Sequence, residues 1–433
     1  MTELNKLKAF LVPKFHQILQ FAMKQGIASA GSLVYGLLCV RLLPRPEYAK
    51  FAVLFGFMGS LAVLLDIGVS STLPPLVGEQ TSNLRLIANY VASIRRIMQR
   101  LFLIVAPAAM FAFVLLVYKQ RWGVWTVAQM LLVLVVTAWF VRVSSTYGAV
   151  LILLRDRSRY YRVQIAGSLG SLALLLIFAA THRINIYVGI LLNVAQVLFI
   201  TGSYYLRALE LLGGKGVPSA KQEKAIVRLA LPNAPSILFY ALQGQITLML
   251  ITVLGHDVSS IANVGALMRL NQILVFVAQM NPILVEPYFA RLQASKLKSV
   301  YLLSLALVAM FAASFSCFAF LFPEIFLWPL GPKYSQLRVE VGLVVLSSAI
   351  QFTGGFIWVV HTARRFVYWW NNVAIIVFTL LVQAVFVLKV DLSTIKNVLI
   401  LNVASVAVST LVAISCGIYG FWRGPQRMER TVN

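Results

Sequence analysis

The sequence predicts an all-α polytopic membrane protein with about twelve transmembrane helices, arranged as two halves of six. Of its 433 residues, 60% are hydrophobic and only 12% are charged, whereas soluble domains carry about 25% charged residues. The apolar residues form runs long enough to cross a bilayer as helices. The charged residues gather in short clusters between these runs, as expected of a chain whose solvent is mostly lipid.

Twelve apolar runs of helical length follow one another along the chain. The first half contains the runs 18–42, 47–74, 98–118, 124–153, 160–181 and 185–206. The second half contains the runs 229–254, 258–285, 299–322, 337–361, 367–388 and 396–421. The longest polar connection covers 207–228 and is rich in glycine. We therefore expect an N-terminal lobe of residues 1–206, a cytoplasmic linker of residues 207–228 and a C-terminal lobe of residues 229–433.

The formal net charge of +24 is explained by orientation in a membrane. With a cytoplasmic N-terminus, the inner segments hold 24 of the 37 lysines and arginines, and the outer segments hold 10. This positive-inside bias predicts an even helix count with both termini in the cytoplasm. The first sixteen residues and Leu84–Arg100 are amphipathic and basic, and we expect them on the inner leaflet. No nucleic-acid motif is present, so nucleic acid is not an expected partner.

Cysteine and histidine usage predicts neither a disulfide framework nor a metal site. Cys39, Cys317 and Cys416 all fall in apolar runs, and the four histidines are equally dispersed. No cofactor is expected. The basic N-terminus is followed by a long apolar segment without a small-residue cleavage pattern, which indicates a retained first helix and not a signal peptide.

An internal repeat is present at an offset of 213 residues. It places Ala49–Leu54 over Ala262–Leu267 and Pro74 over Pro287. The offset pairs the second helix of each half in the same orientation, as in a parallel repeat about an axis along the membrane normal.

Three stretches are similar to motifs of one transporter family. Arg41–Ala49 resembles the first outer turn of polysaccharide flippases, although Ala49 stands where that family more often has glycine. Asp66–Val69 resembles their Asp-x-Gly signature, and Leu330–Tyr334 resembles their outer loop into the tenth helix. On these residues the chain resembles the Wzx-type O-antigen and capsule flippases, within the multidrug/oligosaccharidyl-lipid/polysaccharide exporter superfamily.

This resemblance implies a fold, a substrate and a location. The two six-helix lobes would surround a central cavity that opens alternately to the two sides of the membrane. The substrate would be a polyprenyl-pyrophosphate-linked oligosaccharide, moved from the cytoplasmic to the outer leaflet of the bacterial inner (plasma) membrane. Other implied partners are membrane lipid, a coupling proton or sodium ion, and a polysaccharide polymerase complex.

Cations at mid-membrane depth are the candidate substrate-binding residues, because such charges are costly and usually line a polar path. Arg142 and Arg269 lie near the middle of the fourth and eighth predicted helices. Either arginine could bind pyrophosphate oxygens bidentately, or could make a structural contact between helices. Lys24 lies in the cavity or at the interface, depending on where the first helix begins. Trp139 precedes Arg142 by three residues and so shares its helix face, where it could contact a sugar or simply pack.

Two acids and two amides complete the candidate set. Asp66 could pair with Lys24 as a structural ion pair, or could act as a protonatable gate. Glu286, at the inner end of the eighth helix, is a gating candidate or an interfacial charge. Gln243 and Asn271 could hydrogen-bond sugars or neighbouring helices.

Three other functions are weighed against a flippase. A cation-coupled multidrug exporter of the same superfamily would need an acidic cavity, and beyond Asp66 and Glu286 the sequence offers little of that kind. A membrane enzyme is not expected, because no nucleophile–base pair or metal cluster presents itself. A scaffold of polysaccharide assembly would leave Arg142 and Arg269 without a reason to lie at mid-depth.

Overall fold

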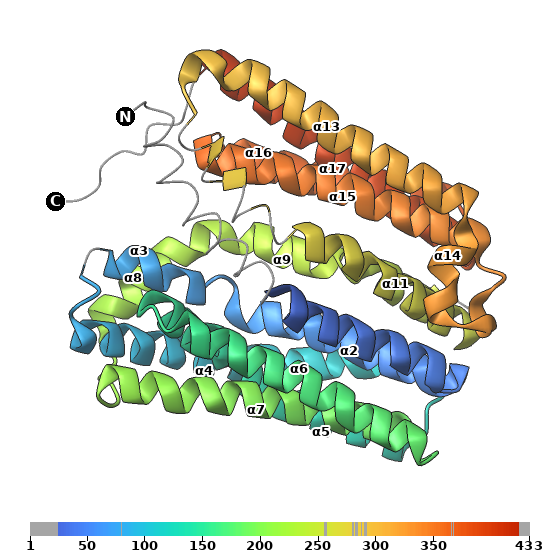
Figure 1. Ribbon diagram of the computed structural model, residues 1–433, viewed down its shortest axis with the longest axis horizontal. Coiled ribbons are helices and arrows are strands. Elements are labelled where there is room, and N and C mark those ends of the chain that lie inside the picture. The colour runs from blue at the N-terminus through green and yellow to red at the C-terminus, as the bar shows by residue number, and fades with distance from the viewer. Residues whose placement is uncertain are drawn as a thin grey trace, which may run out of the picture. The chain divides into compact units, whose positions relative to one another are not determined.

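All regular elements of the described chain are helices (Figure 1). The computed structural model describes residues 25–423, except residues 79, 255–257, 279–280, 282–284, 287, 290–291, 365 and 367. Within this part, ten helices are long and apolar enough to cross a membrane, or eleven if one bent pair counts as a span. The predicted all-α polytopic fold is therefore confirmed.

The chain divides into two compact units, each described here by itself. Unit 2 is Ala30–Gly265, and unit 1 is Ala266–Asn433 together with Met1–Ser29. Unit 2 runs past residue 206 because α9 (Ala234–Gln243) and α10 (Ile246–Leu254) pack against α2 (Arg45–Asp66). The lobes expected at 1–206 and 229–433 remain a prediction.

Unit 2 is a bundle of long helices that lie side by side (Figure 1). A first helix, Gln25–Leu42, begins just before the unit. Its other long helices are α2, α4 (Leu84–Tyr118), α5 (Val124–Leu153), α6 (Arg157–Ala180) and α7 (Ile186–Leu212). Helix α5 packs against α2, α4 and α7, and α6 packs against α7. Helix α5 is therefore the centre of the unit.

Helices α4 and α7 each begin at an asparagine that caps the first turn. The side chains of Asn83 and Asn185 accept hydrogen bonds from the backbone three residues ahead, at 3.0 Å in both cases. These bonds satisfy amides that the first turn of a helix leaves unpaired. The Glu47 carboxylate accepts a further bond of 2.9 Å from the Ile186 amide, which ties the start of α7 to α2.

Helix α2 ends earlier than predicted. The apolar run 47–74 was expected to be one helix, but α2 ends at Asp66 and is followed by η1 (Ser70–Thr72) and α3 (Leu73–Val77). Ile67 and Gly68 both have left-handed backbone angles, with φ of 42° and 75°. Two successive residues in that region end a right-handed helix, so Asp66 becomes its last residue.

Helix α4 begins earlier than predicted. The predicted span 98–118 is only the second part of α4, which starts at Leu84 and is 35 residues long. At 1.5 Å of rise per residue it measures about 52 Å, which exceeds the roughly 30 Å thickness of bilayer hydrocarbon. The basic segment Leu84–Arg100 is therefore the N-terminal part of a continuous membrane helix, and not a separate helix on the leaflet.

The predicted seventh helix, 229–254, is divided in the structure. It appears as the end of α8 (Ala220–Ala230), then η2 (Leu231–Asn233), α9 and α10. Pro232 and Pro235 lack amide hydrogens and cannot continue a regular helical ladder. Gly244 and Gln245 then form the turn between α9 and α10.

The connection between α7 and α8 packs against α4 and is hydrogen-bonded to it. Gly213 ends α7 with a φ of 68°, as a C-terminal cap. The Val217 amide donates to the Asn89 side chain at 2.8 Å, and the Ser219 amide donates to Ser93 Oγ at 3.1 Å. At Gly216 the linker lies directly on α4, since a Cβ there would overlap the Ala88 backbone. This segment is a packed part of unit 2.

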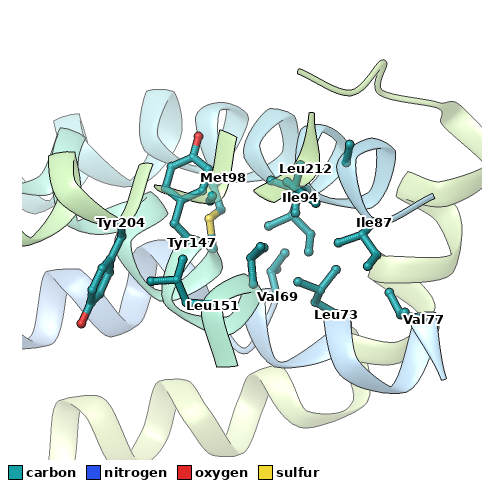
Figure 2. Close-up of a cluster of buried hydrophobic side chains, with 14 of the residues drawn as sticks. Val69, Leu73, Val77, Ile87, Ile94, Met98, Tyr147, Leu151, Tyr204 and Leu212 are labelled. Atoms are coloured by element: carbon teal, nitrogen blue, oxygen red, sulfur yellow. The ribbon is translucent and has the colours of Figure 1, made fainter. Parts of the chain in front are cut away.

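An apolar cluster packs η1 and α3 against α4, α5 and α7. Figure 2 shows Val69, Leu73 and Val77 facing side chains of α4, α5 and α7, among them Ile94, Met98, Tyr147, Leu151 and Leu212. All of these residues are buried, with exposures of 7% or less. The cluster fixes the turn that follows Asp66 against α4 and α5.

Unit 1 is built around α15 (Arg338–Arg364). Helix α15 packs against α13 (Ala294–Leu321) and α17 (Ile395–Arg423), and α17 packs against α16 (Trp369–Lys389). Between α13 and α15 lie three short elements, α14 (Pro323–Leu327), η3 (Trp328–Leu330) and η4 (Pro332–Tyr334). Helix α11 (Val258–Ala278) begins in unit 2 and ends in unit 1.

The helix boundaries support the internal repeat. Helices α2, α4, α5, α6 and α7 begin at residues 45, 84, 124, 157 and 186. Helices α11, α13, α15, α16 and α17 begin at residues 258, 294, 338, 369 and 395, so the offsets are 213, 210, 214, 212 and 209. The first of these offsets equals the one found in the sequence.

Candidate functional site

Arg142 lies in the middle part of α5, in contact with aromatic rings. Its residue exposure is only 5%. The guanidinium carbon is 3.6 Å from the centre of a Trp139 ring and 5.7 Å from that of Phe102 on α4. The Phe102 and Trp139 rings meet edge to face at 5.2 Å. The shared helix face expected for Arg142 and Trp139 is confirmed by this contact.

The hydrogen bonds of Arg142 leave part of the guanidinium unused. Its Nε donates to the Trp139 carbonyl at 2.9 Å, because side chains on a helix point toward its N-terminus. Its Nη1 is buried and has no hydrogen-bond partner within the described chain. An unpaired charged donor in an apolar region is costly, so this nitrogen is a candidate for a ligand oxygen.

Asp66 is held at the end of α2 by two donors. Its Oδ1 accepts from the Ser70 amide at 2.8 Å, and its Oδ2 accepts from the Ser145 hydroxyl on α5 at 2.9 Å. The residue is half-buried. Lys24, its predicted partner, lies outside the described residues. Among the described residues no basic side chain forms an ion pair with Asp66.

Three hydroxyl groups near Asp66 were not singled out from the sequence. Ser70 Oγ lies 2.8 Å from Ser145 Oγ and 2.9 Å from Thr146 Oγ1. Thr146 Oγ1 also lies 3.7 Å from the sulfur of Met98 on α4. The only sequence signal is a pair of hydroxyl residues on α5, three and four positions after Arg142, where a helix brings them onto the same face.

Further arginines lie on the N-terminal part of α4. Arg95 is an electrostatic neighbour of Arg142 and lies within hydrogen-bonding reach of the Tyr147 hydroxyl. Arg96 and Arg100 instead pair with Glu223 on α8, at 3.4 and 2.8 Å. Arg95 and Arg142 therefore give a positive field between α4 and α5 within unit 2.

The remaining predicted site residues are on other elements. Arg269 lies on the part of α11 in unit 1 and is 6% exposed, and its place at mid-membrane depth stays a prediction. Asn271, two residues later, has a buried Oδ1 without a hydrogen-bond partner among the described residues. Gln243 is half-buried at the end of α9, in unit 2, and Glu286 is half-buried in unit 1. Their roles remain predictions.

The side chains of the described residues do not form a metal centre. No group of three or more histidine, cysteine or acidic side chains in that part of the chain could hold a metal ion.

Solved transporter structures share this fold. An inward-facing multidrug resistance MATE family transporter of the MOP superfamily matches with a TM-score of 0.68 and 15% identity, over 92% of this chain and 96% of that one. An outward-facing MATE transporter matches with a TM-score of 0.51 and 17% identity, over 94% of each chain. A MOP superfamily transporter from Pyrococcus furiosus, described as having a binding pocket of reverse polarity, matches with a TM-score of 0.53 and 14% identity, over 94% of this chain and 95% of that one.

These matches show the fold of the MATE transporters. No protein-family model and no curated protein matches the sequence. At identities of 14–17%, the similarity concerns the architecture alone. The chemistry of a substrate must therefore be inferred from the chain's own residues.

Proposed function

We propose that this protein is an alternating-access flippase for an anionic, polyprenyl-pyrophosphate-linked oligosaccharide. It moves this lipid from the cytoplasmic to the outer leaflet of a bacterial inner membrane, with both of its termini in the cytoplasm. The protein is a transporter and performs no covalent chemistry. The fold supports transport, because MATE structures with this architecture occur in inward-facing and outward-facing forms.

The observation that carries the proposal is the state of Arg142. A buried arginine with a free nitrogen can donate to a phosphate oxygen, and such charge-assisted bonds are about twice as strong as neutral ones. The nearby Arg95 adds positive charge, and no acid pairs with Arg142 within the described chain. A diphosphate is attracted to such a field, while a cationic drug is repelled by it.

Trp139 gives this site a route of access. Its side chain is 40% exposed although it covers a nearly buried guanidinium. A rotation of the indole would expose Nη1 of Arg142 and present the ring face to a sugar next to the phosphate. Arg269, Asn271, Gln243 and Lys24 are proposed as further substrate-binding residues, on the basis of their polar groups in predicted membrane segments.

Asp66 and Glu286 are proposed to couple transport to a proton or sodium ion. A second candidate function, cation-coupled multidrug export, is favoured by the MATE names of the similar structures. It requires acids that attract a cationic drug. On the described helices that pack against α5, the Glu47 carboxylate accepts from the Ile186 amide and Glu210 pairs with Arg207. Asp66 is the remaining acid of α2 for that role, so the flippase is preferred. A polysaccharide polymerase complex is the proposed protein partner.

The test is the sidedness of the lipid-linked oligosaccharide in cells that lack the protein. We expect the lipid to accumulate in the inner leaflet. Restoring the wild-type chain relieves the accumulation, and restoring Arg142→Met does not. The matched control is Arg183→Met, the same change at an exposed outer loop residue, which restores transport. Normal sidedness together with a new sensitivity to cationic drugs would replace the flippase by the exporter.

A further inference from the structure

Asp66 is the end of a continuous chain of hydroxyl groups. The chain runs from Asp66 Oδ2 to Ser145 Oγ at 2.9 Å, to Ser70 Oγ at 2.8 Å, and to Thr146 Oγ1 at 2.9 Å. Asp66 is half-buried and Ser145 is exposed, whereas Ser70 and Thr146 are 5% and 1% exposed. The chain therefore connects an accessible carboxylate with the protein interior.

Proton counting fixes the direction of every bond when Asp66 is ionised. An ionised carboxylate only accepts, and each hydroxyl has one proton to donate. Ser145 must give its proton to Asp66, so Ser70 must donate to Ser145. The proton of Ser70 is then used, and Thr146 must donate to Ser70. All three hydroxyls point toward the carboxylate.

Protonation of Asp66 reverses the whole chain. A protonated carboxyl becomes a donor, so Asp66 now donates to Ser145, Ser145 to Ser70, and Ser70 to Thr146. The Thr146 hydroxyl keeps its proton but no longer donates to Ser70. Its O–H turns instead to the Met98 sulfur, 3.7 Å away on α4. No bond between heavy atoms changes, and the one proton taken up stays on the Asp66 carboxyl.

We propose that Asp66, Ser145, Ser70 and Thr146 form a proton-binding site whose three hydroxyls reverse their hydrogen bonds when the carboxyl is protonated. The reversal carries the protonation state of Asp66 from the end of α2 to the contact between α5 and α4. This proposal deepens the coupling role of Asp66 and rests on the transport function proposed above. It assigns the proton as the coupling ion.

The spacing of the oxygens favours a proton over a metal cation. Hard cations hold their oxygen ligands at about 2.3–2.6 Å, so ligands at right angles stand about 3.3–3.7 Å apart. The oxygens of this chain are 2.8–2.9 Å apart, which is hydrogen-bond spacing. A cation among them would have to break the chain.

Other charged groups near Asp66 are engaged elsewhere in unit 2. On α5, Arg142 reaches back over Trp139, away from Ser145. On α4, Arg95 contacts Tyr147, and Arg96 and Arg100 pair with Glu223 of α8. The other titratable groups on the helices that pack against α2 and η1 are Tyr240 of α9, Lys221, Lys224 and Arg228 of α8, Arg85, Tyr90 and Tyr118 of α4, and Tyr187, Tyr204, Tyr205, Arg207 and Glu210 of α7. None of them forms an ion pair with Asp66 within the described residues.

The proposal is tested by infrared difference spectroscopy of the full chain in lipid vesicles, without substrate. Acidification of the wild type should produce a protonated-carboxyl band that is missing in Asp66→Asn. In Ser145→Ala the ionised carboxylate loses a donor, so proton binding should tighten about five- to tenfold. In Thr146→Val the band should change frequency although Thr146 does not touch Asp66. The matched control is Ser71→Ala, whose hydroxyl donates to the Gly68 carbonyl outside the chain, and its band should equal that of the wild type.

Several results would overturn the proposal. One is an acid-induced band that survives Asp66→Asn, and another is a Thr146→Val spectrum identical to that of the wild type. Suppression of the band by sodium at constant pH would assign the site to a metal cation. If Asp66→Asn fails to fold, the comparison of Thr146→Val with the wild type still tests the proposal, because that variant retains the Asp66 carboxyl. The spectra need no substrate. A negative lipid-sidedness experiment would therefore not contradict the proton-binding site, and a negative spectroscopic result would not contradict the flippase.

Discussion

Replacing Arg142 by methionine separates a binding role from a structural role. Methionine is unbranched and fills the same apolar space between Trp139 and Phe102, but it removes the charge. If Arg142 serves to bind substrate, its buried charge lowers the unfolding free energy of the substrate-free protein. Arg142→Met should then abolish transport without unfolding the protein.

The size of the stability change follows from the contacts of Arg142. A charge at the centre of a membrane helix costs about 2.5–3.5 kcal/mol, which the substitution removes. The contact with Trp139 is worth about 0.5–2 kcal/mol, and the bond from Nε to the Trp139 carbonyl about 0.6–1 kcal/mol. The net change in unfolding free energy therefore lies between a loss of about 0.5 and a gain of about 2.5 kcal/mol.

The assay is reversible unfolding in mixed micelles, measured beside transport by the same variant. Arg142→Lys is the companion variant, because it keeps the charge but loses the planar fork that binds phosphate oxygens bidentately. We expect it to fold and to transport poorly. A loss of about 3–5 kcal/mol in Arg142→Met is the cost of breaking a buried ion pair. That loss, combined with normal transport by the fraction that folds, would refute the binding role.

Two further predictions concern the linker between α7 and α8 and the start of α8 itself. Gly216→Ala forces a Cβ against the Ala88 backbone, so we expect about 1–3 kcal/mol of destabilisation and faster tryptic cleavage at Lys215. Gly170→Ala, where a Cβ meets nothing within 4 Å, should neither lower the melting temperature nor speed the cleavage at Lys215, because alanine favours a helix interior more than glycine does. Glu223→Gln breaks pairs with two well-exposed arginines, so chemical unfolding should show a loss of less than about 1 kcal/mol. A loss above 2 kcal/mol would mean that α8 depends on these pairs.

The sequence predicts most helices because lipid imposes a simple rule on apolar runs. The bounds of α5 agree with the predicted 124–153, and those of α15, α16 and α17 agree to within three residues. The rule fails where an interaction other than contact with lipid sets the end of a helix. The apolar run continues through Ile67, so the end of α2 at a left-handed turn is hidden. Conversely, the arginines of α4 interrupt its apolar run, although Arg96 and Arg100 pair with Glu223 of α8.

The candidate site is only partly predictable for a related reason. Arg142 and Trp139 are three residues apart on one helix, so their contact follows from helix geometry. The chain of Asp66, Ser70, Ser145 and Thr146 joins a helix end, a short turn and a second helix. No sequence spacing links these segments. Their meeting depends on the turn at Ile67 and on the packing of η1 against α5.

The most direct test of the proposed function is lipid movement in vesicles that contain only this protein. A pyrophosphate-linked oligosaccharide is placed in one leaflet, and its arrival in the other is followed with an impermeant glycosidase. The account predicts movement well above that of protein-free vesicles, at least a tenfold decrease in Arg142→Met, and no change in Arg183→Met. Movement no faster than in protein-free vesicles, or movement unaffected by Arg142→Met, would contradict it.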